Sequence, residues 1–159
     1  MSTGAVHPSV EKVDAVLAAA GLPGRVRILP DAAATAQAAA DQLGCPVGAI
    51  ANSLVFATGR GAPLLVMTSG AHRVDTRALG ERLGVRLARA DADFVRRHTS
   101  QPIGGVAPVG HPEPLRTVVD VDLAAYQQLW AAGGIPHAVF PITYRDLVAL
   151  TRGEELPVA

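Results

Sequence analysis

The chain has 159 residues, which is the usual size of one domain. Hydrophobic residues make up 49% of it and aromatic residues only 4%, so we expect one core built mainly from Val, Leu, Ile and Ala. Fourteen basic and fourteen acidic side chains give a net charge of zero, which argues against a protein held on nucleic acid by bulk charge. We therefore expect residues 1–159 to form a single domain whose contacts with RNA, if any, are local.

Cys45 is the only cysteine, so neither a disulfide framework nor a cysteine-based metal site can form within one chain. It precedes Pro46 and is interpreted as a small packed residue rather than a nucleophile. The first eight residues lack a basic segment followed by an apolar run, and no stretch approaches the ~20 apolar residues of a membrane span. These features predict a cytoplasmic protein with no membrane contact, no metal and no other cofactor.

Local signals divide the first half of the chain into helices and a hairpin. Ser9 and Thr35 are candidate N-caps, and Gly59-Arg60-Gly61 is a turn between two apolar runs. In chain order the pattern predicts a helix over 10–20, a strand over 25–29, a helix from Thr35 to Gly44, and strands over 53–58 and 63–68.

In the second half, four polar residues stand where helices would begin, and apolar runs separate them. The pattern predicts helices begun by Asp75, Asp91, Asp122 and Thr143 and ending at Leu83, His98, Ala132 and Leu150, with strands over 85–88, 116–121 and 135–140. The tail after Gly153 shows no pattern. Helices and strands interleave, but the clearest strand pair is a hairpin, which favours an α+β fold over a regular parallel α/β sheet.

Residues 103–111 read Ile-Gly-Gly-Val-Ala-Pro-Val-Gly-His and are the most distinctive stretch of the chain. Glycine permits positive φ and close approach of a ligand to the main chain, and proline stiffens such a loop. Composition alone favours an ordinary tight turn around a packed proline. The alternative is a loop that grips a small ligand with its own N–H and C=O groups.

This loop lies within Thr99–His111, a segment that resembles the signature of the YbaK/EbsC family, free-standing relatives of the editing insertion domain of bacterial prolyl-tRNA synthetase. Shorter matching pieces occur in the family's order at 43–50, 52–56, 69–75 and 136–141, so the resemblance covers roughly Thr35 to Leu150. It implies a mixed, largely antiparallel sheet, partly closed into a barrel and flanked by helices.

The resemblance also implies a function, which is hydrolysis of the ester of a wrongly charged tRNA, often the tRNA for proline. The partners would be the tRNA acceptor end and an aminoacyl-tRNA synthetase. An aminoacyl ester is already activated, so the protein needs mainly to orient it and to stabilise the developing oxyanion with backbone N–H donors. Carried over by position, Gly104, Gly105 and Pro108 would form that cradle, and Gly105→Ala is expected to harm function more than stability.

The chain departs from the family at Asn52, because a lysine commonly stands just before the Ser-Leu pair that Ser53 begins here. Asparagine keeps a donor and an acceptor but loses the charge. It could orient the ester carbonyl or a water, or it could merely start a strand. Lys12 lies on the first predicted helix and cannot replace the family lysine, whereas Arg73 could supply the charge.

His111 and His137 are the histidines worth weighing, because imidazole is the natural acid–base group near pH 7. Neither has metal-ligand spacing to another His or Cys, and packed or surface histidines are common. His111 is a catalytic candidate, and His137 is a candidate for substrate contact together with Ser53, Arg73 and Val106. No Gly-x-Ser-x-Gly occurs, so a serine nucleophile is not expected.

Seven arginines between positions 73 and 97 are either solvated helix faces or a phosphate track for a tRNA acceptor stem. Three functions remain open at this point. The chain could be a deacylase acting in trans, a module of the same fold that binds tRNA or aminoacyl esters with weakened catalysis, or a regulatory interaction domain.

Overall fold

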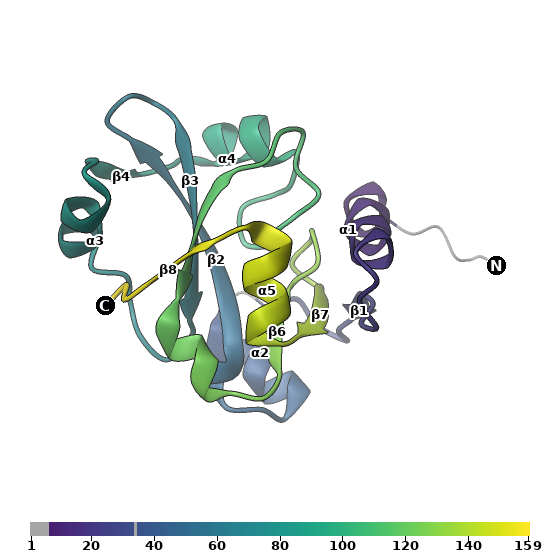
Figure 1. Ribbon diagram of the computed structural model, residues 1–159. Helices are drawn as coiled ribbons and strands as arrows, with labels where there is room; N and C mark the ends of the chain where they lie inside the picture. Colours follow the sequence, from purple (N-terminus) through teal and green to yellow (C-terminus); the bar gives the residue numbers. More distant parts are fainter. Residues whose placement is uncertain (1–6, 34) are drawn as a thin grey trace.

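A computed structural model describes residues 7–33 and 35–159 (Figure 1). Residues 1–6, part of the segment examined for a secretory signal, lie outside the described residues. The fold is α+β, as expected, with five α-helices and one mixed sheet of eight strands among the described residues. None of the helices in this part of the chain is long and apolar enough to cross a membrane.

The helices are α1 (Pro8–Ala19), α2 (Ala36–Leu43), α3 (Thr76–Leu83), α4 (Ala92–Thr99) and α5 (Tyr144–Thr151), with 3-10 turns η1 (Val47–Ala49) and η2 (Val121–Ala125). The strands are β1 (Arg27–Ile28), β2 (Ile50–Thr58), β3 (Pro63–Ser69), β4 (Leu87–Arg89), β5 (Arg116–Asp120), β6 (Leu129–Ala132), β7 (Ala138–Ile142) and β8 (Glu154–Leu156). Four predicted caps are confirmed, since the side chains of Thr35, Asp75, Asp91 and Thr143 each accept a hydrogen bond from the backbone N–H three residues on.

The helix predicted over 122–132 is wrong. Asp120, not Asp122, is the cap, because its carboxylate accepts the backbone N–H of Asp122 at 3.0 Å and starts the short turn η2. Residues 129–132 then form β6 between β2 and β7, where Leu129, Trp130 and Ala131 are all buried. An apolar run of this length suits a strand buried on both faces, and periodicity cannot tell such a strand from a buried helix.

Two smaller corrections lie near the ends of the chain. Helix α1 is capped by His7, whose Nδ1 accepts the N–H of Ser9 at 3.0 Å, and Pro8 occupies the first helical position. The tail, where the sequence showed no pattern, forms β8 over 154–156, which pairs parallel with β5. Neither the pairing of β8 with β5 nor the capping role of His7 follows from local propensity.

The strand order is β1-β7-β6-β2-β3-β5-β8, with β4 paired to β2 off this path. Four pairings are antiparallel and three are parallel, so the sheet is mixed. The hairpin of β2 and β3 is confirmed. The sheet is open rather than partly closed, since its path ends at β1 and β8 without pairing between them.

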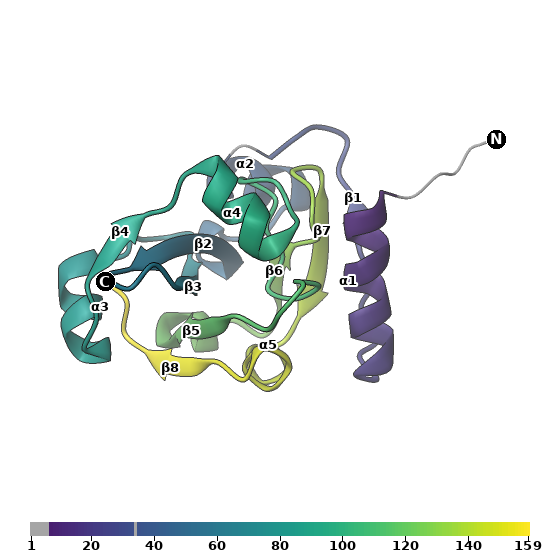
Figure 2. The ribbon, with the colours of Figure 1, turned by 90° about the horizontal axis from the view of Figure 1, so that it is seen from above.

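Helices cover both faces of the sheet. On one face Leu65 and Met67 of β3 belong to the main core with residues of α1, α4 and α5. On the other, Leu64 and Val66 pack with Leu79 of α3, while α2 covers the neighbouring strands β6 and β7. Helix α1 stands beside β7 at one end of the molecule and α3 lies at the opposite end (Figure 2).

Strand β2 is shared between two partners on one of its sides. Its other side pairs with β3 from Ala51 to Ala57, but the shared side pairs with β6 only at Ile50 and Ala51 and with β4 only from Phe56. Residues 52–55 therefore have no strand partner on that side among the described residues. This gap in the ladder positions the candidate site.

Candidate functional site

A pocket of about 210 Å³ lies at the gap in β2, between the sheet and α2. Asn52 and Ser53 line it from β2, and Gly104 lines it from the glycine loop. The pocket thus brings together segments more than fifty residues apart in the sequence. The remaining lining is mainly small or apolar and comprises Ala33, Thr35, Ala36, Ala39, Ile50, Ala51, Leu54, Trp130, Ala131, Ala132, Pro136, Ala138 and Val139.

The gap turns backbone groups of β2 toward the pocket. The N–H of Gly70 donates to the carbonyl of Ile50 at 2.9 Å, which makes Ile50 a residue bonded to the β3 side. Because bonding alternates along an antiparallel strand, the N–H and C=O of Ser53 and Val55 point away from β3. The Ser53 hydroxyl instead lies 3.2 Å from the Met67 sulfur. Ser53 therefore offers the pocket its backbone.

The glycine loop is held from inside by Gln101, a residue that the sequence analysis did not weigh. Its buried side chain donates to the carbonyl of Val109 at 3.1 Å and accepts the N–H of Ala107 at 2.7 Å. Its own N–H donates to the Thr99 hydroxyl at 3.0 Å. The Gln101 side chain thus supplies hydrogen bonds to loop backbone groups that no neighbouring strand supplies. The sequence feature that could have indicated this role is a polar residue just before a glycine-rich segment.

Gly104 is the part of the loop that reaches the pocket. Its φ of +90° is a conformation that residues with a side chain rarely adopt, and a Cβ there would meet nothing within 4 Å. Val106 instead lies in the main core and is only 4% exposed, so it does not line the pocket. The loop therefore presents backbone at one glycine while its apolar residues anchor it.

Pro108 and His111 lie in a different hollow, of about 190 Å³, together with residues of α5 and the segment before β5. The half-buried His111 ring donates from Nε2 to the carbonyl of Ala107 at 2.8 Å. Burial lowers the pKa of His111, and the hydrogen bond to Ala107 opposes that change more weakly. His111 therefore stabilises the loop through its hydrogen bond to Ala107 and does not line the pocket that contains Asn52.

The other two proposed contacts also lie outside the pocket. His137 is exposed, and its carbonyl accepts the N–H of Leu29 at 2.6 Å. Arg73 is exposed on the turn before α3 and does not line the pocket. The family lysine therefore has no replacement at either place.

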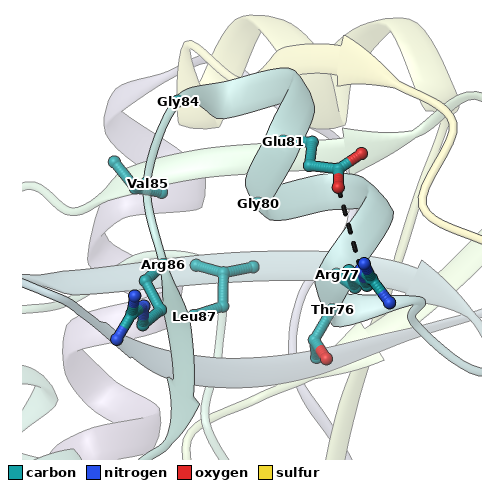
Figure 3. Close-up of a pocket in the computed structure, with 8 residues that line it drawn as sticks. All are labelled: Thr76, Arg77, Gly80, Glu81, Gly84, Val85, Arg86 and Leu87. Carbon is teal, nitrogen blue, oxygen red and sulfur yellow. Dashed lines mark ion pairs between the residues drawn. The ribbon is translucent and has the colours of Figure 1, made fainter.

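A hollow of about 650 Å³, larger than the pocket at the gap in β2, lies between α3 and β4 (Figure 3). Arg77 and Glu81 lie on its α3 side, 3.8 Å apart and both strongly exposed, and Arg86 lies on the other. An exposed pair of this kind contributes little stability. All seven arginines of 73–97 are exposed, as both interpretations of that stretch require. This open hollow contains Arg77 and Arg86 of that stretch but none of the residues proposed for the candidate site.

A second polar cluster joins the end of β3 to η2. Asp120 is only 1% exposed and its carboxylate accepts the N–H of Ser69 at 2.8 Å. The Nε2 of His72 lies 2.9 Å from Asp120 and 3.2 Å from Asp122. The cluster does not follow from the sequence pattern, which favours Asp122 as a helix cap. Its contacts fix the turn after β3, within the 69–75 segment of the resemblance.

Fold and site together define a class of protein, an α+β domain with a pocket at the interrupted edge of a strand, lined by the Asn52 side of β2 and by Gly104. The model of the aminoacyl-tRNA editing domain matches residues 30–150, which is most of the chain. The chain therefore belongs to the aminoacyl-tRNA editing domain family.

Individual relatives are similar to most of the chain. A solved structure described as a candidate trans-editing enzyme for prolyl-tRNA synthetase is 38% identical with a TM-score of 0.90, covering 97% of this chain and 98% of its own. A scaffold protein from computational epitope grafting is 36% identical with a TM-score of 0.89, covering 96% and 98%. The uncharacterised protein YwhH of Bacillus subtilis (strain 168) is 26% identical over 114 residues, 72% of this chain and 73% of YwhH.

Gly105 packs against backbone, which changes the expected effect of Gly105→Ala. A Cβ would lie 2.5 Å from the carbonyl carbon of Ile135 and 2.7 Å from the nitrogen of Pro136. Backbone cannot move aside as a flexible side chain can, so we expect a loss of about 1–3 kcal/mol in the free energy of unfolding. Denaturant unfolding measures it, with Gly59→Ala as control because a Cβ there meets only an ordinary contact at 3.5 Å. Equal stability of the two variants would contradict this packing.

The lowered pKa of His111 predicts a pH dependence of stability. The unfolded chain, with a pKa near 6.5, binds the proton more readily than the folded protein does. The free energy of unfolding should therefore fall as the pH drops below 6.5, until it passes the folded pKa. His111→Gln keeps an N–H donor for Ala107 but does not titrate there, so its stability should depend less on pH. Parallel curves for both proteins between pH 7.5 and 5 would refute the assignment.

Proposed function

We propose that this protein is a trans-acting deacylase that hydrolyses the ester of mischarged tRNA. The observation that carries the proposal is the pocket shared by Asn52 and Gly104 in a chain that belongs to the aminoacyl-tRNA editing domain family. Its volume of about 210 Å³ is below the range of pockets that enclose drug-sized ligands. It suits a single aminoacyl group, with the nucleotide remaining outside.

The proposed chemistry requires orientation and charge stabilisation more than a strong nucleophile. Water adds to the ester carbonyl, the bond to the ribose oxygen breaks, and that oxygen takes up a proton to leave free amino acid and tRNA. The outward-facing N–H of Ser53 and the backbone of Gly104 are the donors proposed for the developing oxyanion. The Asn52 amide would hold the ester carbonyl or the attacking water.

The proline system is the proposed substrate class. The support is the 38% identity, over nearly all of both chains, to the candidate trans-editing enzyme for prolyl-tRNA synthetase. By the same analogy the tRNA acceptor end and a synthetase are the proposed partners. The exposed arginines between 73 and 97 would contact phosphates of the acceptor stem.

A second candidate function is a module that binds tRNA or aminoacyl esters with weakened catalysis. Asn52 favours it, because no lysine, arginine or histidine is among the described residues that line the pocket. A regulatory interaction domain has less support, since it gives no reason for Asn52 and Gly104 to share a pocket. The two candidates differ in whether the ester is hydrolysed.

A panel of mischarged tRNAs tests the proposal directly. Purified protein is incubated with each tRNA, and loss of the ester is followed against a blank without protein. We expect faster hydrolysis for at least one mischarged tRNA for proline and none for correctly charged prolyl-tRNA. Tight binding without hydrolysis across the panel would favour the binding module instead.

Asn52→Lys examines the missing charge. If catalysis is limited by the neutral side chain, an ammonium at this position should raise kcat/KM on a mischarged tRNA, because it adds an electrostatic contact to phosphate or ester. A gain of about 1.4 kcal/mol in transition-state stabilisation corresponds to a tenfold increase in rate. Affinity for uncharged tRNA, measured in parallel, separates tighter binding from faster chemistry.

Asn52→Ala is the matched control for that substitution. It removes the amide without adding charge, so it should lower kcat/KM if Asn52 holds the carbonyl or the water. A fall in activity for both variants would assign the orienting role to the amide itself. Unchanged activity in Asn52→Ala would contradict any role of the Asn52 amide in the reaction.

A further inference from the structure

One cation lies against the pocket from outside the segment that defines the family. Arg27 of β1 precedes residues 30–150, and its guanidinium carbon lies 5.1 Å from the centre of the Trp130 ring. Trp130 lines the pocket, and so does Val139, the residue directly opposite Arg27 across the β1–β7 pair. Arg27 is therefore adjacent to the pocket through two of its lining residues.

Trp130 holds Arg27 in place without neutralising it. Trp130 is only 8% exposed, whereas Arg27 is exposed, so the aromatic ring forms a fixed platform beneath a solvated guanidinium. Stacking of this kind orients the planar fork and leaves its N–H donors free. Arg27 makes no ion pair with an acidic residue of the described ranges. Its donors are thus available to an external anion.

The substrate of the proposed function carries such an anion next to its ester. A 3′-aminoacylated terminal nucleotide is joined to the preceding nucleotide by a phosphodiester, which would lie outside a pocket of about 210 Å³ whose size suits the aminoacyl group. We propose that Arg27, stacked on Trp130, contacts this phosphodiester and positions the ester at the gap in β2. The inference rests on the proposed function, and it makes Arg27 a positioning residue that supplies from β1 the charge that Asn52 lacks.

Arg27→Gln tests the assignment by binding. Trp130 is the only tryptophan of the chain, so its intrinsic fluorescence reports directly on the platform and the pocket. Uncharged tRNA is titrated into the protein at several salt concentrations. We expect Arg27→Gln to raise Kd about tenfold and to reduce the slope of log Kd against log salt by roughly 0.7–0.9, the value for one lost phosphate contact. Arg27→Lys should keep the slope and lose part of the affinity, because it keeps the charge without the planar fork.

Arg25→Gln is the matched control, since Arg25 is an exposed arginine two residues away whose guanidinium donates to the carbonyls of Leu22 and Gly24. It should leave both Kd and the salt slope unchanged. Circular dichroism and thermal unfolding confirm that each variant is folded. Unaltered Kd and slope in folded Arg27→Gln, or equal losses in Arg25→Gln, would overturn the proposal.

Hydrolysis separates this proposal from the function on which it rests. On a mischarged tRNA that the wild type hydrolyses, Arg27→Gln should lower kcat/KM about tenfold. On the same amino acid esterified to adenosine, which has no phosphate, the two proteins should be equal. Equal losses on both substrates would refute the phosphate contact. A wild type that hydrolyses no mischarged tRNA would refute the proposed function, while the salt slope would still decide whether Arg27 binds phosphate.

Discussion

The site depends on the way in which β2 divides one of its sides between two strands. Pairing with β6 ends at Ala51 and pairing with β4 begins at Phe56. An unpaired stretch inside a sheet is costly when it is buried, because backbone N–H and C=O groups need partners. Here the stretch borders a pocket, where water or a ligand can satisfy those groups. The interruption thus leaves backbone groups of β2 open to the pocket, while the uninterrupted pairing with β3 holds the strand in the sheet.

The opposite wall of the pocket is rigid for a different reason. The glycine loop belongs to no strand or helix, yet Gln101 bonds it at two points from within and His111 bonds it from the outside. Buried apolar residues of the loop, including Val106 and Ala107, join the main core. Only Gly104 of the loop is left to face the pocket. A loop held in this way loses little further entropy on binding, which is what a site built from backbone donors requires.

Sequence signals predicted the parts of this structure that are decided locally. Caps such as Asp75 and Asp91, the turn at Gly59-Arg60-Gly61 and the hairpin depend on a few neighbouring residues, and they are confirmed. Strand β6 was mistaken for a helix because its apolar run is buried on both faces, and β8 was missed because its parallel partner β5 lies far away in the chain.

The candidate site shows the same division between local and distant information. The resemblance singled out Asn52 and Gly104, which the structure places in one pocket, but it could not indicate that Val106 packs in the core or that His111 bonds the loop. Arg27 was outside every motif. Its relation to the pocket exists only through Trp130 and the β1–β7 pairing, and neither can be inferred from spacing. Under the proposed function, a half-buried ammonium at position 52 would have to be desolvated, whereas a guanidinium stacked on Trp130 stays in water until the phosphate arrives. The chain then divides between Asn52 and Arg27 the two tasks of orienting the ester and binding its phosphate.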